Sequence, residues 1–165
     1  MGEWKSMMRI NIKALRDNFQ MPRQAHSSDA GYDVFAIDDG KFINEGGTEF
    51  IQYDLGFAAQ PVISDDHSNT DRVHHQGFLM IVPRSSISKY DIILCNSPAI
   101  IDSEYSGEIS LRFKLLISRE DAKLYVAGDR IGQIIPWIAH GAYFKVVDDL
   151  FTTARGSGGW GSTGK

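Results

Sequence analysis

The residues best suited to chemistry in this sequence are polar side chains at the ends of apolar runs. Arg84, Ser85 and Ser86 follow the run GFLMIVP, and a guanidinium with two hydroxyls at a strand end suits phosphate oxygens. Asp102 follows two isoleucines in NSPAIIDSEYSGEI, where a carboxylate within reach of water can act as a general base. Taken alone, the first segment is better explained by an ordinary turn with a solvated Arg84. The alternative for the second segment is a turn in which Asp102 makes an Asx-type bond to the backbone.

A third polar interruption occurs in VAGDRIGQII, where Asp129, Arg130 and Gln133 break an apolar run. A buried ion pair involving Asp129 and Arg130 is the structural alternative for this segment.

The C-terminal stretch GSGGWGSTGK fits the spacing G-x-x-x-x-G-K of phosphate-binding P-loops. A P-loop lies between a strand and a helix and needs Ser or Thr after its lysine, whereas Lys165 is the last residue here. A Walker-type loop is therefore not expected. Arg155 and Trp160 among glycines instead predict a strap that becomes ordered over an anionic, aromatic ligand, with a terminus of no function as the alternative.

Length and composition fit one globular domain. The chain has 165 residues, is 42% hydrophobic and 23% charged, and carries a formal net charge of -4. No nucleic-acid partner is expected from this charge, and a polyanionic ligand would need local arginines or a metal. The single cysteine, Cys95, is expected to be a buried strand residue. No apolar run reaches the ~18 residues of a membrane span, so a soluble, cytoplasmic protein without membrane association is expected.

Alternating apolar and polar residues predict strands along most of the chain. In EISLRFKLLI, Ile109, Leu111, Phe113 and Leu115 alternate with polar residues, which is typical of a half-buried antiparallel strand. The other β-rich runs are RINIKAL, YDVFAI, TEFIQYDLGFAA, GFLMIVP, DIILCN, DRIGQIIPWI and YFKVV, with turn clusters at DDGKFINEGG and SEYSGE. SREDAKLYV is the one segment that allows a turn or two of helix. Many short strands predict a sandwich, jelly roll or small barrel.

The polar segment ISDDHSNTDRVHHQ (63–76) contains three histidines between two predicted strands. Adjacent histidines with nearby aspartates could ligate zinc, but the segment has no His-x3-His or cysteine spacing. A solvated hairpin loop is the favoured interpretation.

Five segments resemble, in order, the motifs of the trimeric dUTPases (deoxyuridine triphosphate nucleotidohydrolases). They are SDAGYDVFA, PRSSISK, NSPAIIDSEYSGEI, GDRIGQII and RGSGGWGSTG, and the resemblance covers roughly residues 9–165. It implies an all-β, jelly-roll-like subunit of a homotrimer, with active sites shared between subunits. It also divides the chain into an N-terminal extension (1–8), a β domain (9–151) with a loop insertion at 63–76, and a flexible glycine-rich C-terminal lid (152–165).

The activity implied by this resemblance is that of a dUTP diphosphatase. Water attacks the α-phosphorus of dUTP and releases dUMP and pyrophosphate, which limits dUTP incorporation into DNA and supplies dUMP for dTTP synthesis. Mg²⁺ is expected on the triphosphate, with no direct protein ligand. Among the matching catalytic residues, Asp102 resembles the one that activates the water, Asp33 the acid that contacts magnesium through water, and Arg84 a phosphate contact.

The resemblance also implies a substrate-binding set. Asn96 and the backbone of a tight NSPAIID hairpin would select uracil, Tyr105 would pack on the deoxyribose and reject a ribose 2′-hydroxyl, and Trp160 would stack on the base where the family usually has Phe. Arg155, Ser162 and Thr163 match tail contacts to the γ-phosphate from a neighbouring subunit. The full set is Ser85, Ser86, Asn96, Ile101, Tyr105, Gln133, Arg155, Gly158, Trp160, Gly161, Ser162 and Thr163.

Two further positions depart from the family pattern, and two other functions compete. Ala99 stands where a glycine is usual and would be strained if that position needs positive φ, and Gly132 replaces a usual alanine. A dCTP deaminase shares the fold but would carry a catalytic Glu where this chain has Arg112. A nucleotide-gated regulatory protein, with the 63–76 loop as its partner site, is the alternative of a different class.

Overall fold

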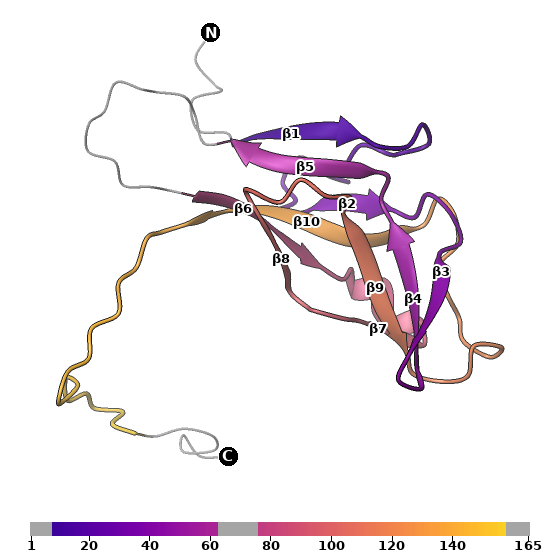
Figure 1. The fold of residues 1–165 in the computed structure, drawn as a ribbon. Coiled ribbons are helices and arrows are strands. Elements are labelled where there is room, and N and C mark those ends of the chain that lie inside the picture. Colours follow the sequence, from indigo (N-terminus) through magenta and orange to yellow (C-terminus); the bar gives the residue numbers. More distant parts are fainter. Residues whose placement is uncertain (1–7, 63–75, 158–165) are drawn as a thin grey trace, which may run out of the picture.

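The computed structural model describes residues 8–62 and 76–157 (Figure 1). This part of the chain is built from strands, with one short 3-10 helix. The elements are β1 (Arg9–Ala14), β2 (Tyr32–Phe35), β3 (Lys41–Glu45), β4 (Thr48–Asp54), β5 (Phe57–Val62), β6 (Gln76–Val82), η2 (Ser85–Lys89), β7 (Ile92–Leu94), β8 (Ala99–Asp102), β9 (Ser110–Leu115) and β10 (Arg130–Ala139). None of the described residues belongs to a helix long and apolar enough to cross a membrane. The expected all-β class is confirmed.

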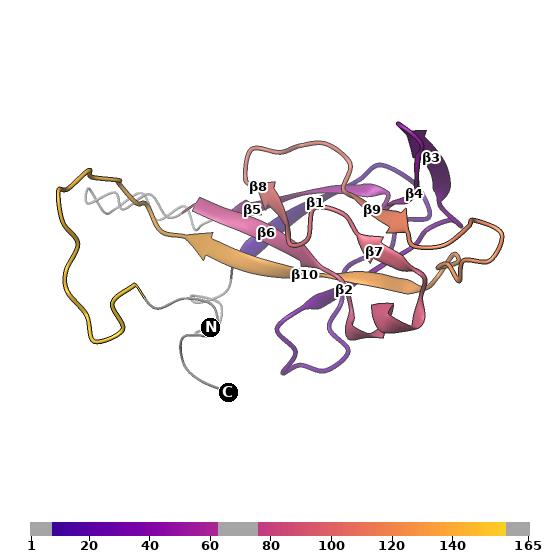
Figure 2. The same cartoon turned by 90° about the horizontal axis from the view of Figure 1, so that it is seen from below.

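The strands form three antiparallel sheets. The first four-stranded sheet has the order β2-β10-β6-β8, the second has the order β3-β4-β9-β7, and β1 pairs with β5 alone. Figures 1 and 2 show the two larger sheets packed together, with the β1–β5 pair along one side. Most pairs therefore join segments far apart in the sequence, as in a jelly roll.

The core forms where the inward faces of the sheets meet. Along β9, Leu111, Phe113 and Leu115 are buried while Ser110 and Lys114 are exposed, so the predicted alternation of this strand is confirmed. The rings of Tyr53 and Tyr125 pack edge-on, with centroids 6.1 Å apart, and Phe113 contacts both. These large side chains connect the second sheet to the loop that precedes β10.

Several local expectations differ from the structure. The turn cluster DDGKFINEGG contains β3, whose pairing with β4 supplies the hydrogen bonds that its composition does not predict. No helix forms around SREDAKLYV, whereas Ser85–Lys89 forms the 3-10 helix η2. The run TEFIQYDLGFAA is two strands, because Gly56 (φ +75) turns the chain between β4 and β5.

The expected hairpin at NSPAIID is also wrong. β7 pairs with β9 in the second sheet and β8 pairs with β6 in the first, so residues 95–98 carry the chain from one sheet to the other. Asp102 is consequently the last residue of β8 and not the tip of a hairpin.

The expected strand YFKVV is not formed. Residues 140–157 run away from the sheets (Figure 1), and Phe144 and Phe151 are each 99% exposed. An alternating apolar pattern needs a partner surface to become a strand, and this chain alone provides none to the described residues of the segment.

Candidate functional site

Asp33 is the one buried charged residue in the described part of the chain, with 3% of its surface exposed. Its Oδ1 atom accepts hydrogen bonds from Arg84 Nε at 2.9 Å and from Gln133 Nε2 at 3.1 Å. Its Oδ2 atom accepts from Arg130 Nη1 at 3.1 Å. Two guanidiniums and an amide thus offset the cost of burying this carboxylate.

Sheet register brings these side chains together. Asp33 on β2 lies directly opposite Gln133 on β10, and Gln133 in turn lies opposite Val82, the last residue of β6. Arg84 follows two residues later, as the N-cap of η2. Three of the residues that the sequence selects, Asp33, Arg84 and Gln133, therefore form one cluster.

The hydroxyls after Arg84 lie at the edge of this cluster. Ser85 is exposed, whereas Ser86 is partly buried and its Oγ lies 3.5 Å from Arg84 Nη1. Behind them, Tyr125 is buried against Tyr90, with ring centroids 4.1 Å apart. Burial raises the pKa of Tyr125 to about 12. Its hydroxyl lies near Ser86 but has no hydrogen-bond partner among the described residues. Uncharged aromatic rings therefore pack next to η2.

Arg130 also belongs to this cluster, although the sequence suggested a different partner for it. The expected ion pair joined it to Asp129, but its partner is Asp33, 97 residues away in the sequence. The carboxylate of Asp129 instead accepts a hydrogen bond from the backbone N–H of Val126 at 2.9 Å, inside the turn before β10. A polar residue between apolar neighbours signals a buried partner, but the sequence does not say which one.

A second group of candidate residues lines an open groove of ≈ 610 Å³. Asp102, Ser103, Glu104 and Tyr105 form one wall, and the other lining residues are Gly77, Phe78, Ile100 and Ala139. The Asp102 carboxylate is exposed and has no hydrogen-bond or ion-pair partner among the described residues. The Tyr105 ring is 45% exposed, and its hydroxyl donates to the carbonyl oxygen of Glu108 at 3.0 Å. A carboxylate open to water beside an aromatic ring suits proton abstraction next to a bound ring system.

The two groups lie at opposite edges of the same sheet. Asp33 is on edge strand β2 and Asp102 on edge strand β8, with β10 and β6 between them. Across the sheet, Asp33 is aligned through Gln133 with Val82 of β6. Asp102 pairs instead with Phe78, four residues before Val82 on the same strand. Three strand spacings and four residues place the backbones of Asp33 and Asp102 roughly 20 Å apart. Within one subunit the two groups therefore lie at separate places on the sheet.

The remaining residues of the proposed base site lie around β8. Asn96 is exposed and has φ +50, the one positive φ of a non-glycine residue in the described ranges. Ile101 is partly buried against the core. Ala99 pairs with Ile81 in ordinary strand geometry, so the strain expected there is absent and the left-handed conformation belongs to Asn96.

Gly132 leaves room for a neighbouring side chain. The pairing of β10 with β2 shifts register between Arg130 and Gly132. A Cβ at position 132 would lie 2.6 Å from Cδ2 of Leu111, so the glycine accommodates Leu111.

The C-terminal candidates divide at residue 157. Arg155 is exposed on the segment after β10, and this segment extends away from the sheets (Figure 2). Gly158, Trp160, Gly161, Ser162 and Thr163 lie outside the described residues, as does the histidine-bearing segment 63–75.

The described residues contain no cluster of three or more His, Cys, Asp or Glu side chains that could hold a metal ion. The carboxylate of Asp33 keeps little free capacity for the expected water-mediated contact to Mg²⁺. Three donors fill three of the roughly four lone-pair positions of its carboxylate. Two of these donors are guanidiniums, which repel a cation.

Comparison with known proteins gives a consistent result. The family model described as dUTPase matches residues 17–164. A deoxyuridine 5'-triphosphate nucleotidohydrolase of Picosynechococcus sp. is 33% identical over 159 residues, covering 95% of this chain and 99% of the relative. The enzyme of the same name from Haemophilus influenzae is 32% identical over 166 residues, covering 96% and 99%.

Solved structures agree in fold. The Staphylococcus bacteriophage 80alpha dUTPase with dUpNHpp superposes with a TM-score of 0.63 at 21% identity and covers 95% of this chain and 99% of its own. A mutant dUTPase from phage phi11 of S. aureus, described as coordinating a structural Mg(II) ion, has a TM-score of 0.61 at 17% identity and covers 86% and 97%.

Proposed function

The chain belongs to the dUTPase family, and from this premise we propose that it hydrolyses dUTP to dUMP and pyrophosphate at sites shared between the subunits of a homotrimer. The observation that carries the proposal is the exposed Asp102 carboxylate beside Tyr105 in the groove at the end of β8. These two residues match the family positions for water activation and sugar packing.

Asp102 acts as the general base in this proposal. Water attacks the α-phosphorus and transfers a proton to Asp102, the bond from the α-phosphorus to the bridging oxygen breaks, and pyrophosphate leaves in line. Exposure at the strand end leaves the carboxylate open to water, and no described donor competes for its lone pairs.

The Asp33 cluster supplies the phosphate-binding part of the site. Arg84 lies partly exposed at the start of η2, followed by Ser85 and Ser86, so that cationic and hydroxyl donors face outward together. Asp33 holds Arg84 and Gln133 in place from behind. Mg²⁺ would arrive on the triphosphate, whose oxygens are the ligands this hard cation prefers, and would neutralise its charge.

The separation of these two parts supports a site shared between subunits. Because roughly 20 Å separates the backbones of Asp33 and Asp102 within one sheet, a single dUTP would reach both if one subunit presents its groove to the η2 edge of another. The exposed segment 140–157 would carry Arg155 and the following residues to a further neighbour, where they close over the nucleotide and exclude water.

The outer face of β9 argues against a deaminase. Arg112, at the position where a deaminase would carry its catalytic Glu, pairs through Nη1 with Glu45 at 2.8 Å and through Nη2 with Gln52 at 3.1 Å. These partners belong to β3 and β4, so Arg112 ties the second sheet together.

The test is pyrophosphate release in the presence of Mg²⁺ from dUTP, dTTP, dCTP and UTP at equal concentration, with the wild type and Asp102→Asn. Release from dUTP alone, reduced roughly 10²- to 10⁴-fold in Asp102→Asn with nucleotide binding retained, supports the proposal. Equal rates for the variant and the wild type would exclude Asp102 as the base. Binding of dUTP without release by the wild type would exclude hydrolysis.

A further inference from the structure

The ring of Tyr105 is confined by its own loop. Its hydroxyl donates to the Glu108 carbonyl, and a Cβ added at Gly107 would lie 2.5 Å from the hydroxyl oxygen and 2.7 Å from Cζ. Gly107 is not among the positive-φ glycines, so an alanine there is acceptable to the backbone. An alanine at position 107 would therefore force the Tyr105 ring to shift.

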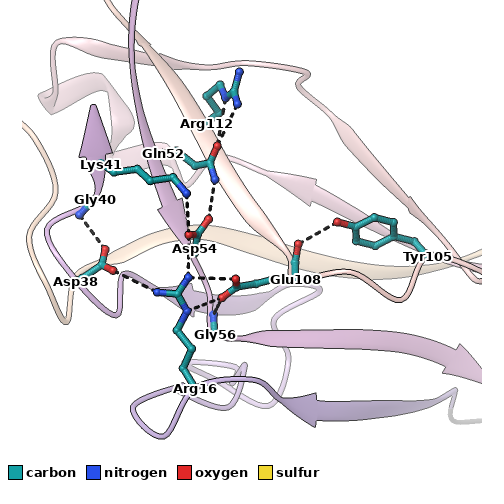
Figure 3. Close-up of polar contacts among 10 residues, drawn as sticks. All are labelled: Arg16, Asp38, Gly40, Lys41, Gln52, Asp54, Gly56, Tyr105, Glu108 and Arg112. Atoms are coloured by element: carbon teal, nitrogen blue, oxygen red, sulfur yellow. Dashed lines mark hydrogen bonds and ion pairs between the residues drawn. The ribbon is translucent and has the colours of Figure 1, made fainter. Parts of the chain in front are cut away.

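The Glu108 carbonyl that holds the ring is itself fixed from behind. The Glu108 carboxylate accepts hydrogen bonds from the backbone N–H of Gly56 at 3.0 Å and from Arg16 Nη2 at 3.1 Å, and Arg16 Nε lies 2.9 Å from it in an ion pair (Figure 3). The next residue, Ile109, exchanges backbone hydrogen bonds with Leu55 and Phe57 on either side of Gly56. The peptide group of Glu108 is thus tied to the turn between β4 and β5.

Arg16 is anchored to the same turn. Its backbone N–H donates to the carbonyl of Gly56 at 3.1 Å, and its Nη2 lies 2.9 Å from Oδ2 of Asp54. The hydrogen bond to Glu108 raises the pKa of Arg16. Burial opposes ionisation of Asp54, but hydrogen bonds from Gln52 and Lys41 outweigh it and lower the pKa of that carboxyl. Both members of the Arg16–Asp54 pair are therefore charged at neutral pH.

We propose that Gly107 and Glu108, backed by Arg16, are positioning residues that fix the Tyr105 ring and thereby set how strongly the enzyme prefers a 2′-deoxyribose over a ribose. The proposal rests on the proposed function, in which Tyr105 packs against the sugar. A ring held by a hydrogen bond at its tip and by close contact along its edge resists the displacement that a 2′-hydroxyl would require.

The test measures kcat/KM for dUTP and for UTP in the full chain. Gly107→Ala displaces the ring, and Tyr105→Phe removes only its hydrogen bond; we expect the dUTP-to-UTP ratio to fall roughly tenfold or more in each. Glu108→Ala removes the anchor of the carbonyl and should lower the ratio in the same direction, whereas Glu108→Gln, which keeps an acceptor for Gly56 and Arg16, should restore most of it. Glu45→Ala, which removes an arginine-paired carboxylate from the second sheet, is the matched control and should leave the ratio unchanged.

A double-mutant cycle separates positioning from general destabilisation. If Gly107 acts through the ring, Gly107→Ala in a Tyr105→Ala background changes the ratio no further. A ratio that stays within about twofold of wild type in both Gly107→Ala and Tyr105→Phe, with circular dichroism melts showing folded proteins, overturns the inference. If Gly107→Ala does not fold, an unchanged ratio in both Tyr105→Phe and Glu108→Ala overturns it equally. A wild type that releases no pyrophosphate from dUTP defeats the proposed function instead, so the two failures are distinguishable.

Discussion

The Nε atom of Arg84 lies 2.9 Å from a carboxylate oxygen of Asp33, although the two residues are 51 apart in the sequence. The acid is buried and the arginine is partly exposed. A cation that faces outward is thus oriented by an anion behind it, which fixes its direction without a bound ligand.

Replacement of Asp33 by asparagine should destabilise the protein. Two guanidiniums would lose their shared countercharge, and breaking a buried pair costs about 3 kcal/mol of unfolding free energy. Urea titrations of the two proteins measure this difference. Asp38→Asn is the control, because Asp38 is 52% exposed and lies 3.9 Å from Arg16, and a surface pair of this kind contributes little to stability. Equal losses in the two variants would contradict the role assigned to the Asp33 cluster.

Mixed subunits should test whether the two edges of the first sheet serve the same site. Asp102→Asn and Arg84→Gln are each expected to be nearly inactive alone. If Asp102 and Arg84 come from different subunits, unfolding the two variants together and refolding them as hybrids restores roughly a quarter of wild-type sites. Pyrophosphate release before and after mixing checks this, and hybrids as inactive as their parents would place both residues in one subunit's site.

Gly132→Ala should destabilise the subunit through a steric effect. The added Cβ would meet Leu111 Cδ2 at 2.6 Å, and overpacking of a core costs about 1–3 kcal/mol. Shortening the neighbour in the double variant Gly132→Ala/Leu111→Val should recover much of this loss. Thermal melts of the single and double variants decide the matter, and a double variant less stable than the sum of the two single changes would rule out the contact.

Alkaline pH should unfold the protein in part through Tyr125. Burial raises its folded-state pKa to about 12 from an ordinary 10, and the pKa of Tyr53 is raised for the same reason. The stabilisation is therefore complete below pH 10 and is lost as the pH rises from about 10 to about 12. Tyr125→Phe should show a shallower loss over this window, measured by urea unfolding at each pH, and an unchanged slope would refute the assignment.

Two elements whose sequence pattern depends only on neighbouring residues were predicted correctly. The alternation in β9 and the turn at SEYSGE depend on neighbouring residues, and both are present. β3 was missed because its composition is that of a turn and its partner β4 supplies the order. The segment at 143–147 has the pattern of a strand but no partner within the described chain.

The site shows the same division between local and distant information. Motif resemblance selected Asp33, Arg84 and Gln133 individually, and the register of β2, β10 and β6 explains why they meet. The partnership of Arg130 with Asp33 and the contact between Gly107 and Tyr105 could not be read from spacing, because each depends on side-chain direction in three dimensions.

The apolar side chains exposed after β10 link the stability of the protein to its concentration. Tyr143, Phe144, Val146, Leu150 and Phe151 expose apolar surface that a single folded chain leaves in water. If neighbouring subunits cover this surface, folding and association become one equilibrium governed by mass action. The melting temperature would then rise with protein concentration, and a subunit newly made at low abundance would be the form most vulnerable to proteases and to aggregation.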